Sequence, residues 1–253
     1  MSAPAGTGKT ALVASWVGQR ETTHDAAWVT FEVGADETGE FWPHVVGCLQ
    51  RHGVDVCASD FLTGPDPGDR RRLTTLAASL AKLSRPLTLV LDGYEFTSAG
   101  VSNELDFVLR HSNHRLHVVI VTRVDPVLPL HRYRLSDMLA EVRMTELAFT
   151  TAEVAALVEA AGLRLSPGSV AALTTRTQGW AAGLRFAIMF LTQSENPDEA
   201  VRQLAGDSGN LAEYLLAEVL QAQPAEVRDV LLRTSVVDVL QPGLIEEIGG
   251  PSA

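Results

Sequence analysis

The sequence predicts an α/β protein: a parallel sheet flanked by helices over residues 1–148, followed by an all-helical domain over residues 149–253. Two observations predict this division. Up to about residue 142, short runs rich in leucine and β-branched residues alternate with amphipathic stretches, which is typical of βαβ units. Beyond residue 147 such runs are missing, and helix-capping residues indicate a series of helices.

Three strands are expected, at residues 26–31, 87–91 and 116–121. The second and third are almost continuously apolar, as in LTLVL and LHVVIV. Strands of this kind usually have both faces covered by helices. We therefore expect both of them to be central in the sheet.

The helical domain is predicted from its helix starts and stops. Thr150 and Glu153 form a capping box ahead of an apolar run, and Gly162 is placed to end that helix. Ser166 followed by Pro167 begins the next helix. Further helical patterns cover residues 180–191, 198–205, 211–221 and 225–234.

Composition and charge narrow the classes of function. Of 253 residues, 46% are hydrophobic and 20% charged, as in ordinary globular proteins. The net charge of −11 opposes binding to a phosphate backbone, so we expect no direct nucleic-acid contact by this segment. No apolar stretch reaches the length of a membrane span and no secretory signal is recognisable. Cys48 and Cys57 have no metal or disulfide spacing, so the expected location is cytoplasmic, without a membrane partner.

The first residues with clear chemistry are APAGTGKT, ahead of a helical pattern. Apart from Ala3 in place of the first glycine, they match the phosphate-binding loop G-x-x-x-x-G-K-[ST]. In such a loop Ala5, Gly6, Thr7 and Gly8 turn backbone N–H groups toward phosphate oxygens. The small glycines allow the required curl of the backbone.

Lys9 and Thr10 complete the predicted loop. Lys9 would reach the β- and γ-phosphates of a nucleotide, and the Thr10 hydroxyl would coordinate Mg²⁺. The alternative is a flexible helix N-terminus with a solvated lysine. A second motif favours the nucleotide: the strand at 87–91 ends in Asp92, in the position of a metal-binding carboxylate. Asp92 could otherwise simply begin a turn with Gly93. Together the two motifs indicate a P-loop NTPase.

Further motifs resemble those of the large ATP-binding LuxR-type transcription regulators, which are STAND-class P-loop NTPases. The similarity extends over essentially the whole chain. Its markers are APAGTGKT, AWVTFE, GEFWPHVVGCLQ, LVLDGYE, TRVDPVLPLHRYR, LAEVRMTELAFTTAEVAAL, TQGWAAGLRFA and LAEYLLAEVLQAQPAEVRDVLLRTSV. The resemblance implies an adenine nucleotide, ATP or ADP, with Mg²⁺ as cofactor.

The resemblance also implies roles for residues outside the loop. Arg123 resembles the sensor arginine that contacts the γ-phosphate; its alternative is a surface arginine paired with Asp125. Arg132 and Arg134 match the family's L-x-R-x-R segment, or else form a solvated helix face. Gly179-Trp180-Ala181 stands where related ATPases carry a Gly-x-Pro element, but lacks the proline. The periodic apolar neighbours of Trp180 favour a place in the core of the helical domain over stacking on adenine.

Three departures from the family pattern affect the expected activity. Gly93 replaces a second acidic residue that would orient the attacking water, and Glu95 is the nearest substitute. We therefore expect slow or absent hydrolysis. The strand that normally precedes the phosphate loop is missing, which predicts either a gap with unpaired backbone groups or a rearranged sheet. We expect either that the protein starts upstream of this sequence or that the loop is poorly anchored. The family's winged-helix, sensor and helix-turn-helix modules are absent from this sequence.

The sequence thus predicts a nucleotide-controlled switch that sets the self-association of a transcription regulator. Asp92, Glu95 and Arg123 are its candidate catalytic residues, and Thr10 and Asp92 its candidate metal ligands. One alternative is a turnover ATPase or small-molecule kinase that uses the same loop. The other is a protein-interaction scaffold with a degenerate nucleotide site.

Overall fold

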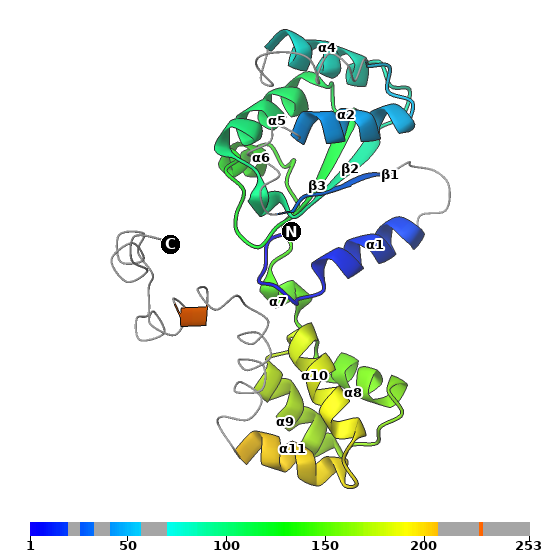
Figure 1. Cartoon of the computed structure of the whole chain (residues 1–253), viewed down its shortest axis with the longest axis vertical. Helices are drawn as coiled ribbons and strands as arrows, with labels where there is room; N and C mark the ends of the chain where they lie inside the picture. The colour runs from blue at the N-terminus through cyan, green and yellow to red at the C-terminus, as the bar shows by residue number, and fades with distance from the viewer. Residues whose placement is uncertain (20–25, 33–40, 57–69, 207–227, 230–253) are drawn as a thin grey trace. The chain divides into compact units, whose positions relative to one another are not determined.

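The computed structural model describes residues 1–19, 26–32, 41–56, 70–206 and 228–229 (Figure 1). The chain divides into two compact units. The first unit comprises Met1–Phe149 together with the tripeptide Trp180–Ala182. The second unit comprises Thr150–Gly179 and Gly183–Ala253.

A three-stranded parallel sheet forms the centre of the first unit. Its strands, β1 (Ala26–Thr30), β2 (Leu87–Asp92) and β3 (Leu116–Val121), lie in the order β1-β2-β3. The three predicted strands are confirmed to within one residue at each end. Since the strands are parallel and Asp92 lies opposite both Thr30 and Val121, their carboxyl ends meet at one edge.

Helices flank this sheet on both faces. The described helices of the first unit are, in chain order, α1 (Lys9–Gln19), α2 (Phe41–Arg51), α4 (Arg70–Ala81), the 3₁₀ helix η1 (Tyr94–Phe96), α5 (Ala99–His111), α6 (Leu130–Leu135) and α7 (Met144–Leu147). In Figure 1, α2, α4 and α5 lie on one side of the sheet and α1 lies on the other.

The side chains of β2 explain this arrangement. Leu89 and Leu91 are fully buried in the larger core, which the strands share with α2, α4 and α5. Val90 points to the opposite face and packs with Val13 of α1 and Val121 of β3. Alternate residues of a strand face opposite sides, so a strand covered twice must be apolar throughout. The predicted central position of β2 is confirmed.

The same prediction is wrong for β3, which is an edge strand of the described sheet. Leu116 and Val121 are buried, but His117 is exposed and the residues between are only partly covered. Its apolar sequence therefore has an uncovered edge.

The first three residues of the chain, which lead into the phosphate loop, pair with the residue that follows β3. Ser2 forms a parallel bridge with Thr122, and the Thr122 N–H donates to the Met1 carbonyl over 3.1 Å. On its other side, Ser2 donates to the carbonyl of Val142 over 3.0 Å. The expectation of a poorly anchored loop is therefore wrong, because backbone hydrogen bonds hold its start on both sides.

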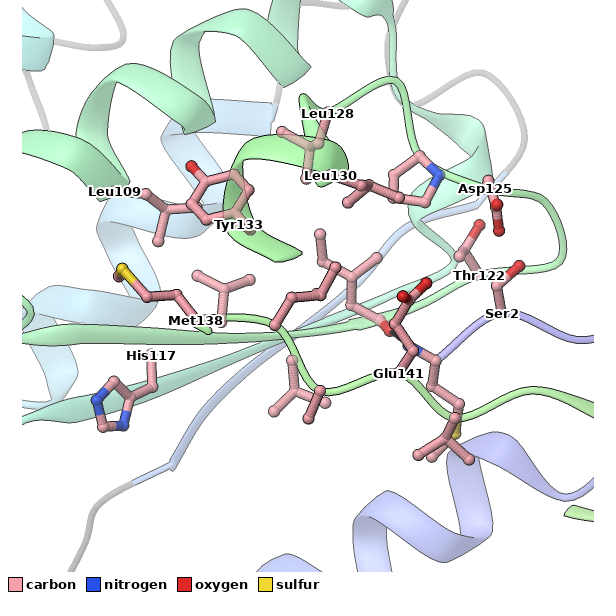
Figure 2. A pocket seen from close by; sticks show the side chains of 18 of the residues that line it. Ser2, Leu109, His117, Thr122, Asp125, Leu128, Leu130, Tyr133, Met138 and Glu141 are labelled. Atoms are coloured by element: carbon pink, nitrogen blue, oxygen red, sulfur yellow. Dashed lines mark hydrogen bonds between the residues drawn. The ribbon is translucent and has the colours of Figure 1, made fainter. Parts of the chain in front are cut away.

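Beside β3 the structure has the expected gap rather than a rearranged sheet. This gap is a mainly apolar groove of about 970 Å³ (Figure 2). β3 forms one wall and residues 138–143, which have no regular secondary structure, form another. Leu109 of α5, Tyr133 of α6 and Trp16 of α1 also line it. The groove lies entirely within the first unit.

The described part of the second unit contains α8 (Thr151–Ala160), α9 (Pro167–Thr177), α10 (Ala181–Thr192, whose first residues cluster with the first unit) and α11 (Pro197–Gly206). The predicted capping box is confirmed, since Thr150 N–H donates to the Glu153 carboxylate over 2.8 Å. The Ser166 cap and the left-handed Gly162 are confirmed too. The predicted helix at 211–221, and all of 225–234 except the helical residues 228–229, lie outside the described residues.

Among the described helices, none combines the length and hydropathy that a bilayer crossing requires.

Candidate functional site

The loop at residues 5–8 turns sharply before α1 begins at Lys9. Gly6 and Gly8 have φ of 70° and 84°, in the left-handed region that glycine enters without strain. The Thr7 hydroxyl donates to the Pro4 carbonyl over 3.0 Å, and Thr7 is buried. The loop is thus curled and braced from inside, as the motif predicted.

Lys9 lies at the centre of this loop. Its ammonium donates to the carbonyl of Ala3 over 2.6 Å and to that of Pro4 over 2.8 Å. Burial lowers the pKa of Lys9 below its usual value, and only 9% of the residue is exposed. Ala3, which replaces the first glycine of the motif, is itself buried. The alternative of a solvated lysine is wrong.

Thr10 and Asp92 come together from different elements. Thr10 is the second residue of α1 and Asp92 ends β2, and the Thr10 hydroxyl donates to the Asp92 carboxylate over 3.2 Å. A hydroxyl and a carboxylate are hard oxygen donors of the kind that Mg²⁺ prefers. In the described part of the chain, no cluster of three or more His, Cys, Asp and Glu side chains offers another metal site.

Glu95 and Arg123 also meet at this edge of the sheet. The Arg123 guanidinium lies 3.0 Å from the Glu95 carboxylate, and the Arg123 backbone N–H donates to the same group over 3.1 Å. Glu95 is nearly buried, whereas Arg123 is largely exposed. The predicted alternative, an Arg123–Asp125 pair, is wrong, because Asp125 pairs with Arg143.

Steric crowding explains why position 93 holds a glycine and not the second acidic residue of the family pattern. Its φ is 76°, and a Cβ built there would lie 2.4 Å from the carbonyl oxygen of Phe31. Real Cβ atoms do not approach an oxygen that closely. A carboxylate side chain therefore cannot occupy this position without a shift of the backbone.

The charged residues of the site influence one another. Besides burial, the charges of Glu95, Arg123 and Asp92 all act on the pKa of Lys9; the two carboxylates raise it and the guanidinium lowers it. The structure thus brings the predicted loop, Asp92, Glu95 and Arg123 to the carboxyl edge of the sheet. In parallel α/β sheets, this edge is where ligands bind.

The prediction that Trp180 packs in the core of the helical domain is wrong, because Trp180 lies against the phosphate loop. Its indole N–H donates to the Ala5 carbonyl over 3.0 Å, and the backbone N–H of Ala182 donates to the Gly6 carbonyl over 2.9 Å. Periodicity missed this contact because the partners stand 175 positions apart and neither carries a local signal.

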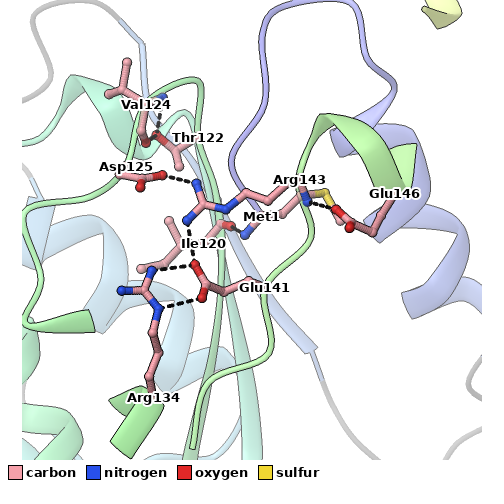
Figure 3. A network of polar contacts seen from close by, with 9 residues as sticks. All are labelled: Met1, Ile120, Thr122, Val124, Asp125, Arg134, Glu141, Arg143 and Glu146. Atoms are coloured by element: carbon pink, nitrogen blue, oxygen red, sulfur yellow. Dashed lines mark hydrogen bonds and ion pairs between the residues drawn. The ribbon is translucent and has the colours of Figure 1, made fainter. Parts of the chain in front are cut away.

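Arg132 and Arg134 are exposed on α6, and no described contact joins either to the loop. Arg134 forms two hydrogen bonds of 2.7 and 2.8 Å to Glu141, which also binds Arg143 (Figure 3). Donation from Arg134, and then from Arg143, lowers the pKa of Glu141 to about 2. The prediction of a solvated helix face did not include this ion pair of Arg134 with Glu141.

No model of a known protein family matches the chain. Individual proteins match it over nearly its whole length. The chain is 33% identical over 258 residues to the serine/threonine-protein kinase PknK of Mycobacterium tuberculosis, covering 98% of the chain and 23% of that protein.

Two transcription regulators match equally fully. The chain is 28% identical over 262 residues to the HTH-type transcriptional regulator MalT of Serratia proteamaculans, and 27% identical over 264 residues to that of Klebsiella pneumoniae. Each match covers 99% of the chain and 28% of the regulator. The predicted similarity to large transcription regulators is confirmed, and the chain spans about a quarter of the length of these curated relatives.

Proposed function

We propose that this chain is the ATP- or ADP-binding regulatory switch module of a LuxR-type transcription regulator, with slow or absent ATP hydrolysis. The observation that carries the proposal is the glycine loop at the start of α1. It surrounds the buried ammonium of Lys9 and places Thr10 beside Asp92. Residues 1–148 would form the P-loop NTPase domain and residues 149–253 the helical domain.

The loop residues suit a polyphosphate. The backbone amides of residues 5–10 lie at the N-terminus of a helix, where the dipole favours an anion. Lys9 would exchange its two loop carbonyls for phosphate oxygens. Thr10 and Asp92 would hold Mg²⁺, which supplies charge neutralisation to the bound phosphates. Arg123, with an exposed guanidinium, is the proposed sensor of the terminal phosphate.

Slow hydrolysis follows from how the acidic groups are placed. Position 93 has no room for the carboxylate that would orient water. Glu95 already accepts hydrogen bonds from the backbone and the side chain of Arg123. Both oxygens of this carboxylate are engaged by Arg123, which holds Glu95 in place and leaves it less free to turn toward an attacking water.

The relatives support a regulatory role. A protein named as a kinase and others named as transcription regulators carry a similar segment, although their names describe different activities. A segment that both kinds of protein share is more consistent with a regulatory role than with a reaction specific to the kinase or to the transcription regulators. We propose self-association, or contact with other domains of a larger regulator, as its output. We propose no direct nucleic-acid contact, since the net charge is −11, and a cytoplasmic location.

Calorimetry with Mg·ATP and Mg·ADP tests the proposal. Wild type should bind both with different affinities, because a ligand shifts a switch only through differential affinity for its states. Lys9→Ala should abolish or greatly weaken binding. Lys82→Ala is the matched control, because Lys82 is the only other lysine and is exposed at the end of α4. Absence of heat in wild type, or equal binding by the two variants, would contradict a nucleotide site.

One observation favours a second candidate, a scaffold with a degenerate site: Lys9 is already satisfied by Ala3 and Pro4. A scaffold should give no heat with either nucleotide, in wild type or in Lys9→Ala. A turnover ATPase would instead release phosphate steadily at about 1 per second or faster. The switch predicts nucleotide binding with release far below that rate.

A further inference from the structure

Two hydrogen bonds join the tripeptide Trp180–Ala182 to neighbouring peptide units of the phosphate loop. The indole N–H of Trp180 donates to the Ala5 carbonyl over 3.0 Å. The backbone N–H of Ala182 donates to the Gly6 carbonyl over 2.9 Å. All of these residues belong to the first unit.

These bonds fix more than the carbonyl groups. In a trans peptide, the C=O and the N–H that follows it share one plane and point in opposite directions. The structure contains no cis peptide among its described residues. Holding the Ala5 carbonyl therefore sets the direction of the Gly6 N–H, and holding the Gly6 carbonyl sets that of the Thr7 N–H. Both amides are turned away from the tripeptide.

The close approach also explains the residue at position 6. A Cβ on Gly6 would lie 2.7 Å from the Ala182 methyl and 3.1 Å from the Trp180 ring. At Gly8, the nearest such atom, the Ala181 methyl, would be 3.9 Å away. Gly6 is therefore the glycine whose lack of a side chain admits the tripeptide, whereas Gly8 has space around it.

We propose that Trp180 and Ala182 are positioning residues of the phosphate loop. They hold two consecutive peptide planes so that the Gly6 and Thr7 amides are already oriented toward a polyphosphate. This inference rests on the proposed nucleotide site. Its physical basis is preorganisation: amides that are oriented in advance bind an anion without a further ordering cost.

The chain supplies a matched pair of tryptophan variants. Trp180→Phe keeps an aromatic ring against the loop and removes the N–H that Ala5 accepts. Trp28→Phe removes an equivalent indole bond, the one that Trp28 donates to the Thr30 hydroxyl over 3.1 Å on β1. Both tryptophans are partly buried. Trp28→Phe therefore measures how the loss of an indole hydrogen bond away from the loop affects nucleotide binding.

We expect Trp180→Phe to weaken Mg·ADP binding about fivefold, the factor that corresponds to one net neutral hydrogen bond, and to speed ADP release. Trp28→Phe should leave both unchanged. Adenosine, which has no phosphate, should bind wild type and Trp180→Phe equally. A purely structural role would lower the melting temperature without this difference between the two ligands.

A double-mutant cycle provides the second measurement. Gly6→Ala should weaken ADP binding through both backbone strain and the clash with Ala182. Adding Ala182→Gly removes the clash, so part of the lost affinity should return. If wild type binds no nucleotide, the proposed function itself is overturned. If wild type binds but Trp180→Phe binds ADP as tightly and the cycle is additive, the positioning role is overturned and the proposed function stands.

Discussion

Two glycines with nearly the same backbone angle have very different surroundings. Gly93, after the strand-end carboxylate, has φ of 76°, and Gly162, after α8, has φ of 77°. A Cβ at Gly93 would strike the Phe31 carbonyl oxygen, whereas a Cβ at Gly162 would meet no atom within 4 Å. Gly93 is required by its positive φ and by the lack of space for a side chain, whereas Gly162 is required by its positive φ alone.

This difference predicts the effects of two substitutions. Gly162→Ala should cost about 1–2 kcal/mol in the free energy of unfolding, the strain of a left-handed alanine. Gly93→Ala should cost about 1–3 kcal/mol more, because the new methyl also displaces the Phe31 backbone. Guanidinium denaturation of the two variants measures both losses. Equal losses would show that the contact at Phe31 does not matter.

Lys9 offers a chemical test at the same scale. The chain has two lysines, one buried in the loop and one exposed. An acyl-phosphate derivative of ATP transfers its acyl group to an amine beside the bound phosphates. We expect mass spectrometry to find label on Lys9, suppressed by excess ATP, with Lys82 labelled weakly and unaffected by ATP. Label confined to Lys82 would contradict phosphate binding by the loop.

At the scale of elements, one carboxylate joins three segments of the first unit. Glu141 lies in the irregular segment 138–143, Arg134 lies on α6, and Arg143 precedes α7 as its N-cap residue. Arg143 also binds Asp125, which follows β3. The network fixes the far wall of the groove, although each bond is exposed and individually weak.

The network predicts an acid response. The pKa of Glu141 is lowered from 4.5 to about 2 by its arginine partners. Since the lowered value belongs to the folded state, the stabilisation is complete above pH 4.5 and is lost as the pH falls toward 2. Carboxyl NMR should give a Glu141 midpoint near pH 2. Glu141→Gln should lose less stability than wild type over this range, and a midpoint near 4.5 would contradict the network.

At the scale of the molecule, the groove beside β3 is the main departure from a closed sheet. Met1 and Ser2 occupy its end, and the Met1 ammonium donates to the Ile120 carbonyl over 2.8 Å. Burial and then the charge of Arg143 lower the pKa of this amino group. Even-numbered residues of β3 turn their backbone groups toward the groove, so Val118 has its N–H and C=O on that side.

An added strand should therefore stabilise the first unit. We expect five valine and isoleucine residues fused before Met1 to raise the melting temperature by several degrees, through apolar burial and new bonds to β3. A Gly-Ser extension of equal length is the control. Hydrogen exchange at the Val118 amide should slow only in the apolar fusion. No slowing there would contradict strand addition.

The sequence predicts local structure and motif chemistry well for physical reasons. Strand periodicity, the Thr150 cap and the loop glycines all act within a few residues, so their pattern is visible in the chain. The Trp180–Ala5 contact and the Glu95–Arg123 pair depend on tertiary packing, which no short window contains. The residues of β3 did not themselves predict its uncovered edge, because a continuous apolar run looks the same whether or not a neighbour covers it; only the missing strand before the loop predicted a gap.

The internal bonds of Lys9 have a consequence for discrimination between anions. In the proposed site, an incoming phosphate competes with two carbonyl oxygens, because the Lys9 ammonium already donates to Ala3 and Pro4. Orthophosphate is small, so it gains little beyond its own contact with the Lys9 ammonium. A longer polyanion reaches the ammonium and the loop amides together and gains from both. We therefore expect the loop to bind orthophosphate weakly, and to bind pyrophosphate and longer polyphosphates more tightly.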